Sequence, residues 1–134
     1  MEDYPKAALR HWQDAELLAR EARVDNADHH YGFAAECALK TAMVGLPAFS
    51  TREGLDGSYH KHVDQLWCRI RHQSLQKAFP GLYAFLGAEN PFVSWNVDQR
   101  YAATGVVSNG DMALHKNAAK RLLGCVGFLG GRSV

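Results

Sequence analysis

The sequence lacks the features that mark membrane, secreted and disulfide-stabilised proteins. No stretch of its 134 residues approaches the ~20 consecutive apolar residues that a transmembrane helix needs. The N-terminus has no basic region followed by an apolar run, which a signal peptide would have. The three cysteines, Cys37, Cys68 and Cys125, are odd in number and widely spaced, which fits neither a disulfide framework nor a zinc knuckle. These absences predict a cytoplasmic protein that does not bind a membrane.

The sequence also has little net charge and none of the common catalytic motifs. Fifteen basic and fourteen acidic side chains give a net charge of +1, which argues against a strongly basic nucleic-acid binder but leaves room for a local basic patch. The chain contains no G-x-S-x-G elbow, no phosphate-binding Walker loop and no G-x-G-x-x-G fingerprint. We therefore assign no catalytic residues, no metal ligands and no cofactor from the sequence.

Helix-forming segments make up most of what is present. The length and the 47% apolar content are ordinary for one globular domain, which spans residues 1–134. Turn residues divide the chain into helical segments at about 4–23, 28–44, 58–70, 75–86 and 112–129. This pattern predicts an all-α protein, a four- to five-helix up-and-down bundle with mainly antiparallel neighbours.

The ends of these segments carry recognisable signals. Asp3 is the expected cap of the first helix and Asp111 that of the last, and Gly130-Gly131 is the expected stop after the last helix. Residues 24–27 read as a turn, and Pro80 predicts a kink or two short helices within 75–86.

The segment at 28–44 is apolar on most faces and is the expected central, buried helix. Glu36 and Lys40 interrupt its apolar surface and lie one turn apart, the spacing at which a carboxylate and an ammonium group pair.

Histidines are numerous, and two pairs stand near the starts of predicted helices. They are His29-His30 and His60-x-His62. The simplest interpretation is that these are surface residues, because zinc needs three or four converging donors and side chains two residues apart on a helix point in different directions. If a histidine serves as an acid or base, the candidates to orient its ring are Glu36, Asp64 and Asp98.

The segment 95–101 is the most distinctive polar stretch. Arg100 is suited to bidentate binding of a phosphate or carboxylate, and Tyr101 is suited to stacking on a base or filling the core. The alternative is a structural anchor, in which Trp95 and Tyr101 bury the loop and Arg100 neutralises a carboxylate such as Glu36.

Several of these segments, in their order along the chain, resemble the HEPN superfamily of helical nucleotide-binding domains. The residues that carry the resemblance are His11-Trp12-x-x-Ala15, the stretch 31–40 with Ala35-Glu36 and Leu39-Lys40, His60 and His62 before Val63 and Leu66, and Trp95 through Arg100-Tyr101. They are similar to the family's buried "AaE-x-aLK" helix, its "H-x-L" helix start and its "RY" segment. The resemblance covers about residues 6–125.

The HEPN resemblance implies a helical bundle that commonly forms a homodimer. Many members are metal-independent ribonucleases of toxin–antitoxin, CRISPR or phage-defence systems, and they carry an Arg-x4–6-His motif near the last long helix. Here Arg100 has no histidine within the next seven residues, whereas Arg23 precedes His29 and His30 at a permitted spacing but between the first two helices. Other members are noncatalytic nucleotide- or RNA-binding and protein-interaction modules, often encoded beside a nucleotidyltransferase.

We therefore expect a non-enzymatic HEPN-like homodimer that binds a nucleotide, an RNA or a partner protein such as a nucleotidyltransferase, in a toxin–antitoxin or defence context. Its candidate ligand-binding residues are Glu36, Lys40, Asp98, Arg100 and Tyr101. Arg100 and Lys40 would hold phosphate, Tyr101 would stack, and Glu36 or Asp98 would orient Arg100.

Two alternatives stay open. One is a divergent metal-independent ribonuclease that uses Arg100 with His115, or Arg23 with His29 or His30. The other is a purely structural interaction domain, in which the Glu36–Lys40 pair and Arg100 form internal ion pairs.

Overall fold

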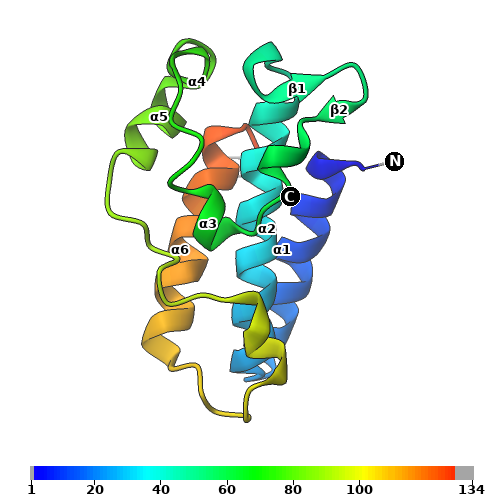
Figure 1. The fold of residues 1–134 in the computed structure, drawn as a ribbon. Helices are drawn as coiled ribbons and strands as arrows, with labels where there is room; N and C mark the ends of the chain where they lie inside the picture. The colour runs from blue at the N-terminus through cyan, green and yellow to red at the C-terminus, as the bar shows by residue number, and fades with distance from the viewer. Residues whose placement is uncertain (1, 129–134) are drawn as a thin grey trace.

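A computed structural model describes residues 2–128, in which three long helices form a bundle and three short helices lie beside it. The long helices are α1 (Tyr4–Arg20), α2 (Val24–Val44) and α6 (Asn109–Cys125), and the short ones are α3 (Val63–Leu66), α4 (Gln73–Ala78) and α5 (Pro80–Leu86). Figure 1 shows α2 between α1 and α6, with α4 and α5 at one end of the bundle. The prediction of an all-α bundle is confirmed.

Helix α1 begins where the sequence predicts and ends earlier. The Asp3 carboxylate accepts a hydrogen bond from the Lys6 N–H at 3.1 Å, which caps the helix as expected. Ala8, Trp12 and Ala15 are buried on the side that faces α2. The helix ends at Arg20 rather than residue 23, and Ala22 then adopts a left-handed φ of 59° as the chain reverses into α2.

Helix α2 starts four residues before the predicted position, so the expected turn at 24–27 is wrong. The Ala27 N–H already bonds to the Arg23 carbonyl at 2.9 Å, and the Ala27 side chain is fully buried against the bundle. As a result Asp28 lies inside the helix and has no exposed surface. The expectation of a central, buried helix at 28–44 is confirmed, because α2 packs against both α1 and α6.

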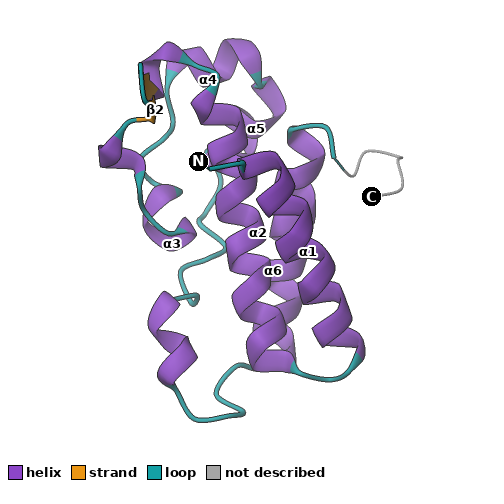
Figure 2. Cartoon of the chain, turned by 90° about the vertical axis from the view of Figure 1, so that its right-hand side faces the viewer, coloured by secondary structure: helices purple, strands orange, loops and turns teal. Residues whose placement is uncertain are grey.

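Glu16 on α1 joins all three long helices. Its carboxylate accepts a hydrogen bond from the Tyr31 hydroxyl on α2 and pairs with the Lys116 ammonium of α6 at 3.4 Å. Figure 2 shows these three helices side by side along the length of the bundle.

The chain between α2 and α6, which we call the crossing segment (residues 45–108), is mostly irregular. It contains η1 (Pro47–Phe49), the antiparallel strands β1 (Ser50–Thr51) and β2 (Gly54–Leu55), η2 (Gly57–Tyr59), α3 to α5, and η3 (Val97–Tyr101). The helix expected at 58–70 is wrong in extent, since only Val63–Leu66 form a regular α-helical turn. Pro80 does divide the next segment into two short helices, α4 and α5, as predicted.

The predicted bounds of the last helix also need correction. Ser108, and not Asp111, caps α6, because the Ser108 Oγ accepts from the Asp111 N–H at 3.0 Å. The helix ends at Cys125, and the predicted stop at Gly130-Gly131 lies outside the described residues.

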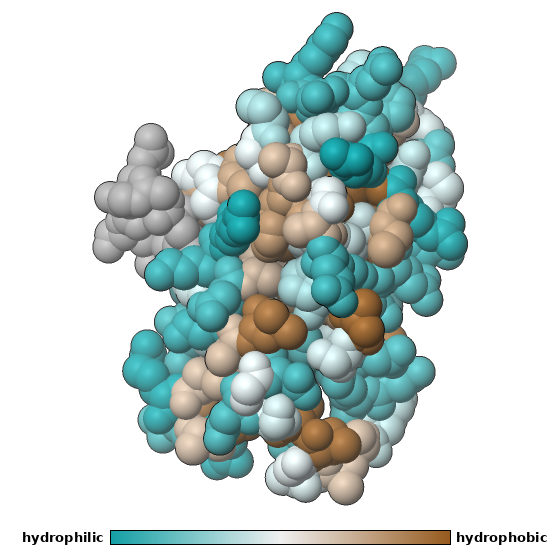
Figure 3. Space-filling view, turned by 90° about the vertical axis from the view of Figure 1, so that its left-hand side faces the viewer, coloured by the Kyte–Doolittle hydropathy of each residue, from teal (hydrophilic) through white to brown (hydrophobic). Residues whose placement is uncertain are grey.

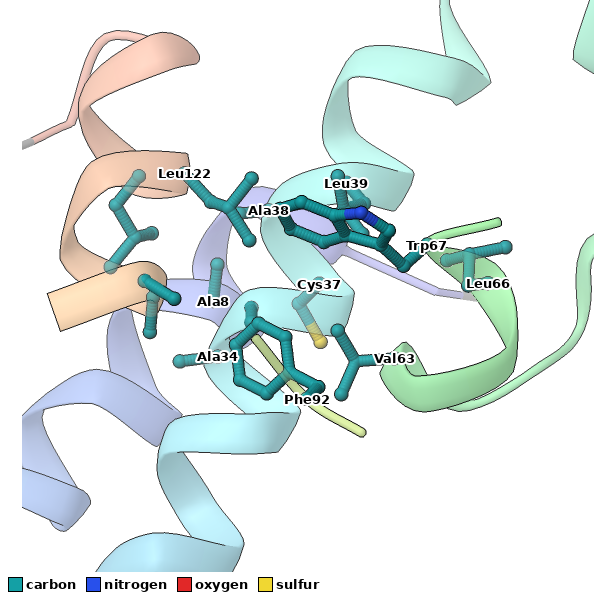
Figure 4. Close-up of a cluster of buried hydrophobic side chains, with 14 of the residues drawn as sticks. Ala8, Ala34, Cys37, Ala38, Leu39, Val63, Leu66, Trp67, Phe92 and Leu122 are labelled. Carbon is teal, nitrogen blue, oxygen red and sulfur yellow. The ribbon is translucent and has the colours of Figure 1, made fainter. Parts of the chain in front are cut away.

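Small side chains on α2 let large side chains of the crossing segment pack closely. Figure 4 shows Phe92 and Trp67 beside Ala34 and Ala38, with Leu122 of α6 completing the cluster. Cys37 lies in the same core, where burial raises the pKa of its thiol to about 12. That thiol stays protonated near neutral pH and is a poor nucleophile.

The surface is mainly polar. Figure 3 shows separate small apolar areas surrounded by hydrophilic side chains on one face of the molecule. The large apolar residues that are exposed in the described chain come from different elements: Leu17, Val44, Val93, Tyr101, Val106 and Leu114. Among residues 2–128, no helix combines the length and the apolar character needed to cross a membrane.

Gly32 on α2 is the position where an added methyl group conflicts most directly with the fold. A Cβ built there would lie 2.1 Å from Cε2 of Trp95, whose indole is 1% exposed. We expect Gly32→Ala to lower the free energy of unfolding by roughly 3 kcal/mol or more, because a rigid ring must move out of a packed core. The measurement is urea denaturation followed by circular dichroism.

Gly124→Ala is the matched control, since Gly124 also lies in a helix but an added Cβ there meets no atom within 4 Å. It should leave stability unchanged or raise it by up to about 1 kcal/mol through helix propensity. Equal stability of the two variants would show that Trp95 does not require the glycine.

Candidate functional site

A polar cavity of about 510 Å³ lies at the N-terminal end of α2. It is enclosed by the turn from α1 to α2 on one side and by η3 on the other, at the lower end of the bundle in Figure 1. Its lining residues are Glu21, Ala22, Arg23, Val24, Asp25, Asn26, His29, Gln99, Arg100, Ala102 and Thr104. We call this the α2 cavity.

Two guanidinium groups on the lining of the α2 cavity have no acidic partner. Within residues 2–128, no carboxylate oxygen lies within 4.0 Å of Arg23 or Arg100. The nearby Asp25 carboxylate is used differently, because its two oxygens accept the N–H groups of Gly105 at 2.9 Å and Val107 at 3.2 Å. Asp25 thus holds the loop before α6 in place and leaves both arginines free to bind an anion.

The first turn of α2 adds a second source of positive potential. Val24, Asp25 and Asn26 form this turn and line the cavity. No side chain caps the helix at Arg23, and the first N–H groups of a helix have no intrahelical partner. Together with the helix dipole, such groups favour an anion at this end.

His29 is held firmly at the wall of the cavity. Its ring stacks on Trp95 at a centroid distance of 5.3 Å, and the Trp95 Nε1–H donates to the Asp28 carbonyl at 3.1 Å. Burial lowers the pKa of His29, and the neighbouring His30 lowers it further. The imidazole is therefore neutral near pH 7 and able to accept a proton.

The structure separates the predicted site residues into two groups. Arg100 lines the α2 cavity from η3, whereas Glu36 and Lys40 lie farther along α2 and are not part of its lining. The predicted pairing of Glu36 with Lys40 is confirmed at 2.9 Å. Glu36 also contacts His62 Nδ1 at 2.8 Å, so one of the expected ring-orienting carboxylates does meet a histidine.

The suggested orientation of Arg100 by Glu36 or Asp98 is not what the structure contains. Neither carboxylate pairs with Arg100 among residues 2–128; instead the Arg100 guanidinium lies over the ring of Tyr101, 4.7 Å from its centroid. Tyr101 is 77% exposed and Trp95 only 1%, so of these two aromatic side chains only Trp95 anchors the segment in the core. The phenol ring of Tyr101 is left on the surface, next to a cavity-lining arginine.

Four histidines gather around Phe33 on the outer face of α2. The ring centroids of His11, His29, His30 and His62 lie 4.8–6.1 Å from that of Phe33. His11 Nδ1 and His30 Nδ1 are 3.1 Å apart. In the part of the chain that the structure describes, no three His, Cys, Asp or Glu side chains are arranged to hold a metal ion.

A buried polar chain next to the cavity was missed by the sequence analysis. The Asp28 carboxylate contacts His115 Nδ1 at 2.5 Å, and His115 Nε2 lies 3.0 Å from the Ser94 Oγ. Asp28 was missed because it was placed at a helix start, where an acidic residue is usually exposed. The available signal was its position on the apolar stripe with Tyr31 and Ala35, and His115 shares a stripe with Ala118, Ala119 and Leu122 in the same way.

The histidines around Phe33 predict that the fold is weakened by acid. Burial lowers the pKa values of His11, His29 and His30 below the ordinary value of 6.5. Below that pH the unfolded chain binds more protons than the folded one, so the free energy of unfolding falls as the pH drops below 6.5. Replacing both His11 and His30 with Gln should reduce this slope, measured by urea denaturation at pH 7.5, 6.5 and 5.5.

His72→Gln is the control, because His72 is exposed and lies outside the cluster, where its Nδ1 caps the short helix α4. It should change stability by a similar amount at every pH and keep the slope of the unmodified protein. An unchanged slope in the His11/His30 double variant would contradict the predicted origin of the acid sensitivity.

Comparisons of the chain with protein-family models, with curated proteins and with solved structures found no match. The resemblance to HEPN domains therefore stays a prediction from the sequence motifs. The geometry of the α2 cavity and of the residues around it is the basis for the proposed function.

Proposed function

We propose that the α2 cavity binds the phosphate group of a nucleotide or of an RNA chain. The observation that carries this proposal is the convergence of the unpaired arginines Arg23 and Arg100 with the uncapped N-terminus of α2 around one cavity. Guanidinium groups bind phosphate oxygens in pairs of parallel hydrogen bonds. A helix N-terminus supplies further N–H donors and a favourable dipole.

Other groups around the cavity favour a nucleotide over a simple inorganic anion. Tyr101 is exposed beside Arg100, in a position to stack on a base. Glu21 lines the cavity and offers a carboxylate to accept hydrogen bonds from ribose hydroxyl or base amino groups. The volume of about 510 Å³ falls within the usual range for small-molecule sites.

In this proposal Arg100 and Tyr101 keep the roles that the sequence suggested for them, and Arg23 replaces Lys40 as the second phosphate-binding cation. Lys40 is already paired with Glu36 and is nearly buried, and it is absent from the cavity lining. The HEPN resemblance extends the proposal to a homodimer that works with a nucleotidyltransferase or another protein partner in a toxin–antitoxin or defence context.

The direct test compares nucleotide binding by three arginine variants. We expect Arg23→Ala and Arg100→Ala each to weaken binding of AMP, ATP or a short RNA by roughly ten- to a hundred-fold, since each removes hydrogen bonds to a charged group. Isothermal titration calorimetry at low and high salt measures the loss. Arg69→Ala is the matched control, because Arg69 is exposed on the crossing segment and outside the cavity.

If the unmodified protein binds none of these ligands, or if Arg69→Ala weakens binding as much as Arg100→Ala, the proposed site is wrong. Thermal unfolding of each variant without ligand separates a loss of binding from a loss of folding.

One observation favours ribonuclease activity as a second candidate function. Arg23 and His29 line the same cavity and have the spacing Arg-x5-His, within the range of the HEPN ribonuclease motif. A neutral His29 is suited to take the proton of a ribose 2′-hydroxyl, while Arg23 and Arg100 stabilise the charge that develops on phosphorus. His115 is absent from the cavity lining and has no exposed surface, so the alternative pairing of Arg100 with His115 has no such support.

The ribonuclease candidate predicts cleavage of single-stranded RNA that persists in EDTA and is lost in His29→Gln. Gel analysis of a labelled oligonucleotide measures the reaction, and His72→Gln should retain full activity because His72 lies away from the cavity. RNA that stays intact with the purified unmodified protein would leave binding as the function of this cavity.

A further inference from the structure

Ser94, His115 and Asp28 form a continuous hydrogen-bonded chain that the nucleotide site does not use. They come from three elements: Ser94 from a turn before η3, His115 from α6 and Asp28 from α2. The Ser94 Oγ is 3.0 Å from His115 Nε2, and His115 Nδ1 is 2.5 Å from the Asp28 Oδ1. The serine meets Nε2 and the carboxylate meets Nδ1, which is the connectivity that activates serine nucleophiles on unrelated folds.

The three groups differ in exposure as a serine nucleophile with a buried base requires. Asp28 and His115 have no exposed surface, whereas Ser94 is an exposed residue. The ring of Phe92 stacks on that of His115 at 5.3 Å and 18°, which fixes the imidazole plane. A substrate can therefore reach the hydroxyl group while the imidazole and the carboxylate stay out of water.

The Asp28 carboxylate carries an unused oxygen, which a purely structural contact does not explain. Its Oδ2 is buried and has no hydrogen-bond partner among the described residues. A buried polar atom without a partner is costly. The negative charge on this carboxylate becomes favourable when the adjacent imidazole takes up a proton, because the two groups then form an ion pair.

The turn that carries Ser94 also offers hydrogen-bond donors for an oxyanion. The Asn90 side chain holds this turn, since its Oδ1 accepts from the Phe92 N–H at 2.9 Å and its Nδ2–H donates to the Asp64 carbonyl at 3.0 Å. The backbone N–H of Ser94 lies next to the hydroxyl group of the same residue, and no short hydrogen bond from it is found within residues 2–128. An N–H on the nucleophile itself is a common part of an oxyanion hole.

We propose that Ser94 is the nucleophile of an acyl-transfer site, with His115 as its general base and Asp28 as the residue that orients His115. The substrate class is small activated esters or thioesters, because Ser94 lies on an open turn beside the 77% exposed side chain of Val93. This site is separate from the α2 cavity, whose lining contains none of the three residues.

Water is the only reactant needed besides the ester or thioester substrate. The Ser94 Oγ bonds to the carbonyl carbon while its proton passes to His115 Nε2, and the carbonyl oxygen becomes an oxyanion. The bond to the leaving oxygen or sulfur then breaks, and that atom takes the proton from Nε2. Water next attacks the acyl-serine, gives a proton to Nε2, and releases a carboxylic acid as the proton returns to Ser94.

The test is covalent labelling by a fluorophosphonate probe, measured by intact mass and peptide mapping. In the unmodified protein Ser94 should be labelled at least about 100-fold faster than other serines, and Ser94→Ala should remove the label. Ser58 is the internal control, because its Oγ is also exposed and bonded to a carboxylate, Asp56 at 2.9 Å, but among residues 2–128 it forms no hydrogen bond with a histidine. Hydrolysis of p-nitrophenyl acetate should show the same dependence on Ser94.

The pH profile of labelling tests the role of His115 without changing the interior. The rate at Ser94 should fall as the pH is lowered, because a protonated imidazole cannot accept the serine proton. His115→Gln and Asp28→Asn, where they fold, should each lower the rate by at least about 100-fold. A Ser94 rate equal to that of Ser58, or one that does not change with pH, would overturn the proposal.

The nucleotide site and the Ser94 site can be tested independently of each other. Ser94→Ala should bind nucleotides as the unmodified protein does, and Arg23→Ala and Arg100→Ala should keep the rate of Ser94 labelling. Loss of nucleotide binding in Ser94→Ala, or loss of Ser94 labelling in Arg23→Ala and Arg100→Ala, would contradict the separation of the two sites.

Discussion

The contact between Trp95 and Gly32 is the constraint on which both candidate sites depend. Because Gly32 has no side chain, the indole ring lies directly against α2, and its Nε1–H bonds to the Asp28 carbonyl. This contact fixes the crossing segment at one point along the helix. It thereby places Ser94 against His115 on one side and Gln99 and Arg100 at the end of α2 on the other. Without it, residues 92–101 would have little regular structure to hold them, since η3 is a single 3-10 segment.

Polar residues at successive positions along α2 have different roles. Its N-terminal turn faces the cavity with free N–H groups and the cationic side chain of Arg23. The next turns carry the buried Asp28 inward and His29 and His30 outward, and Glu36 binds Lys40 and His62 farther on. Small residues between these positions, such as Ala34 and Ala38, allow the neighbouring elements to approach. One helix thus serves as the centre of the core and carries polar residues of both candidate sites.

Polar contacts between the long helices set how these helices align. The buried Asp28–His115 contact joins α2 to α6 in a region that is otherwise apolar, whereas the partly exposed Glu16 joins α1, α2 and α6 through Tyr31 and Lys116. Replacing a buried pair such as Asp28–His115 with apolar groups of similar size is often neutral or stabilising, whereas removing one partner is strongly destabilising. The pairing therefore specifies how the helices align. Because the Asp28–His115 chain ends at the exposed Ser94, it can also take part in a reaction.

The sequence by itself determined the helical class, the buried central helix, the Asp3 cap, the break at Pro80 and the pairing of Glu36 with Lys40. Each of these depends on residues no more than about one helical turn apart, or on the periodicity of one segment. The same local reasoning misplaced the start of α2 and the extent of α3, where burial against the rest of the bundle overrides weak local signals.

Only the tertiary structure decided which polar residues meet. Arg23 and Arg100 are far apart in the chain yet line one cavity, whereas Glu36 pairs with its neighbours on α2 and not with Arg100. Asp28, Ser94 and His115 come together because Trp95 docks on Gly32 and α6 packs along α2. The physical reason is that these contacts are set by how three helices and an irregular segment pack, and the spacing of residues along one chain holds no information about that.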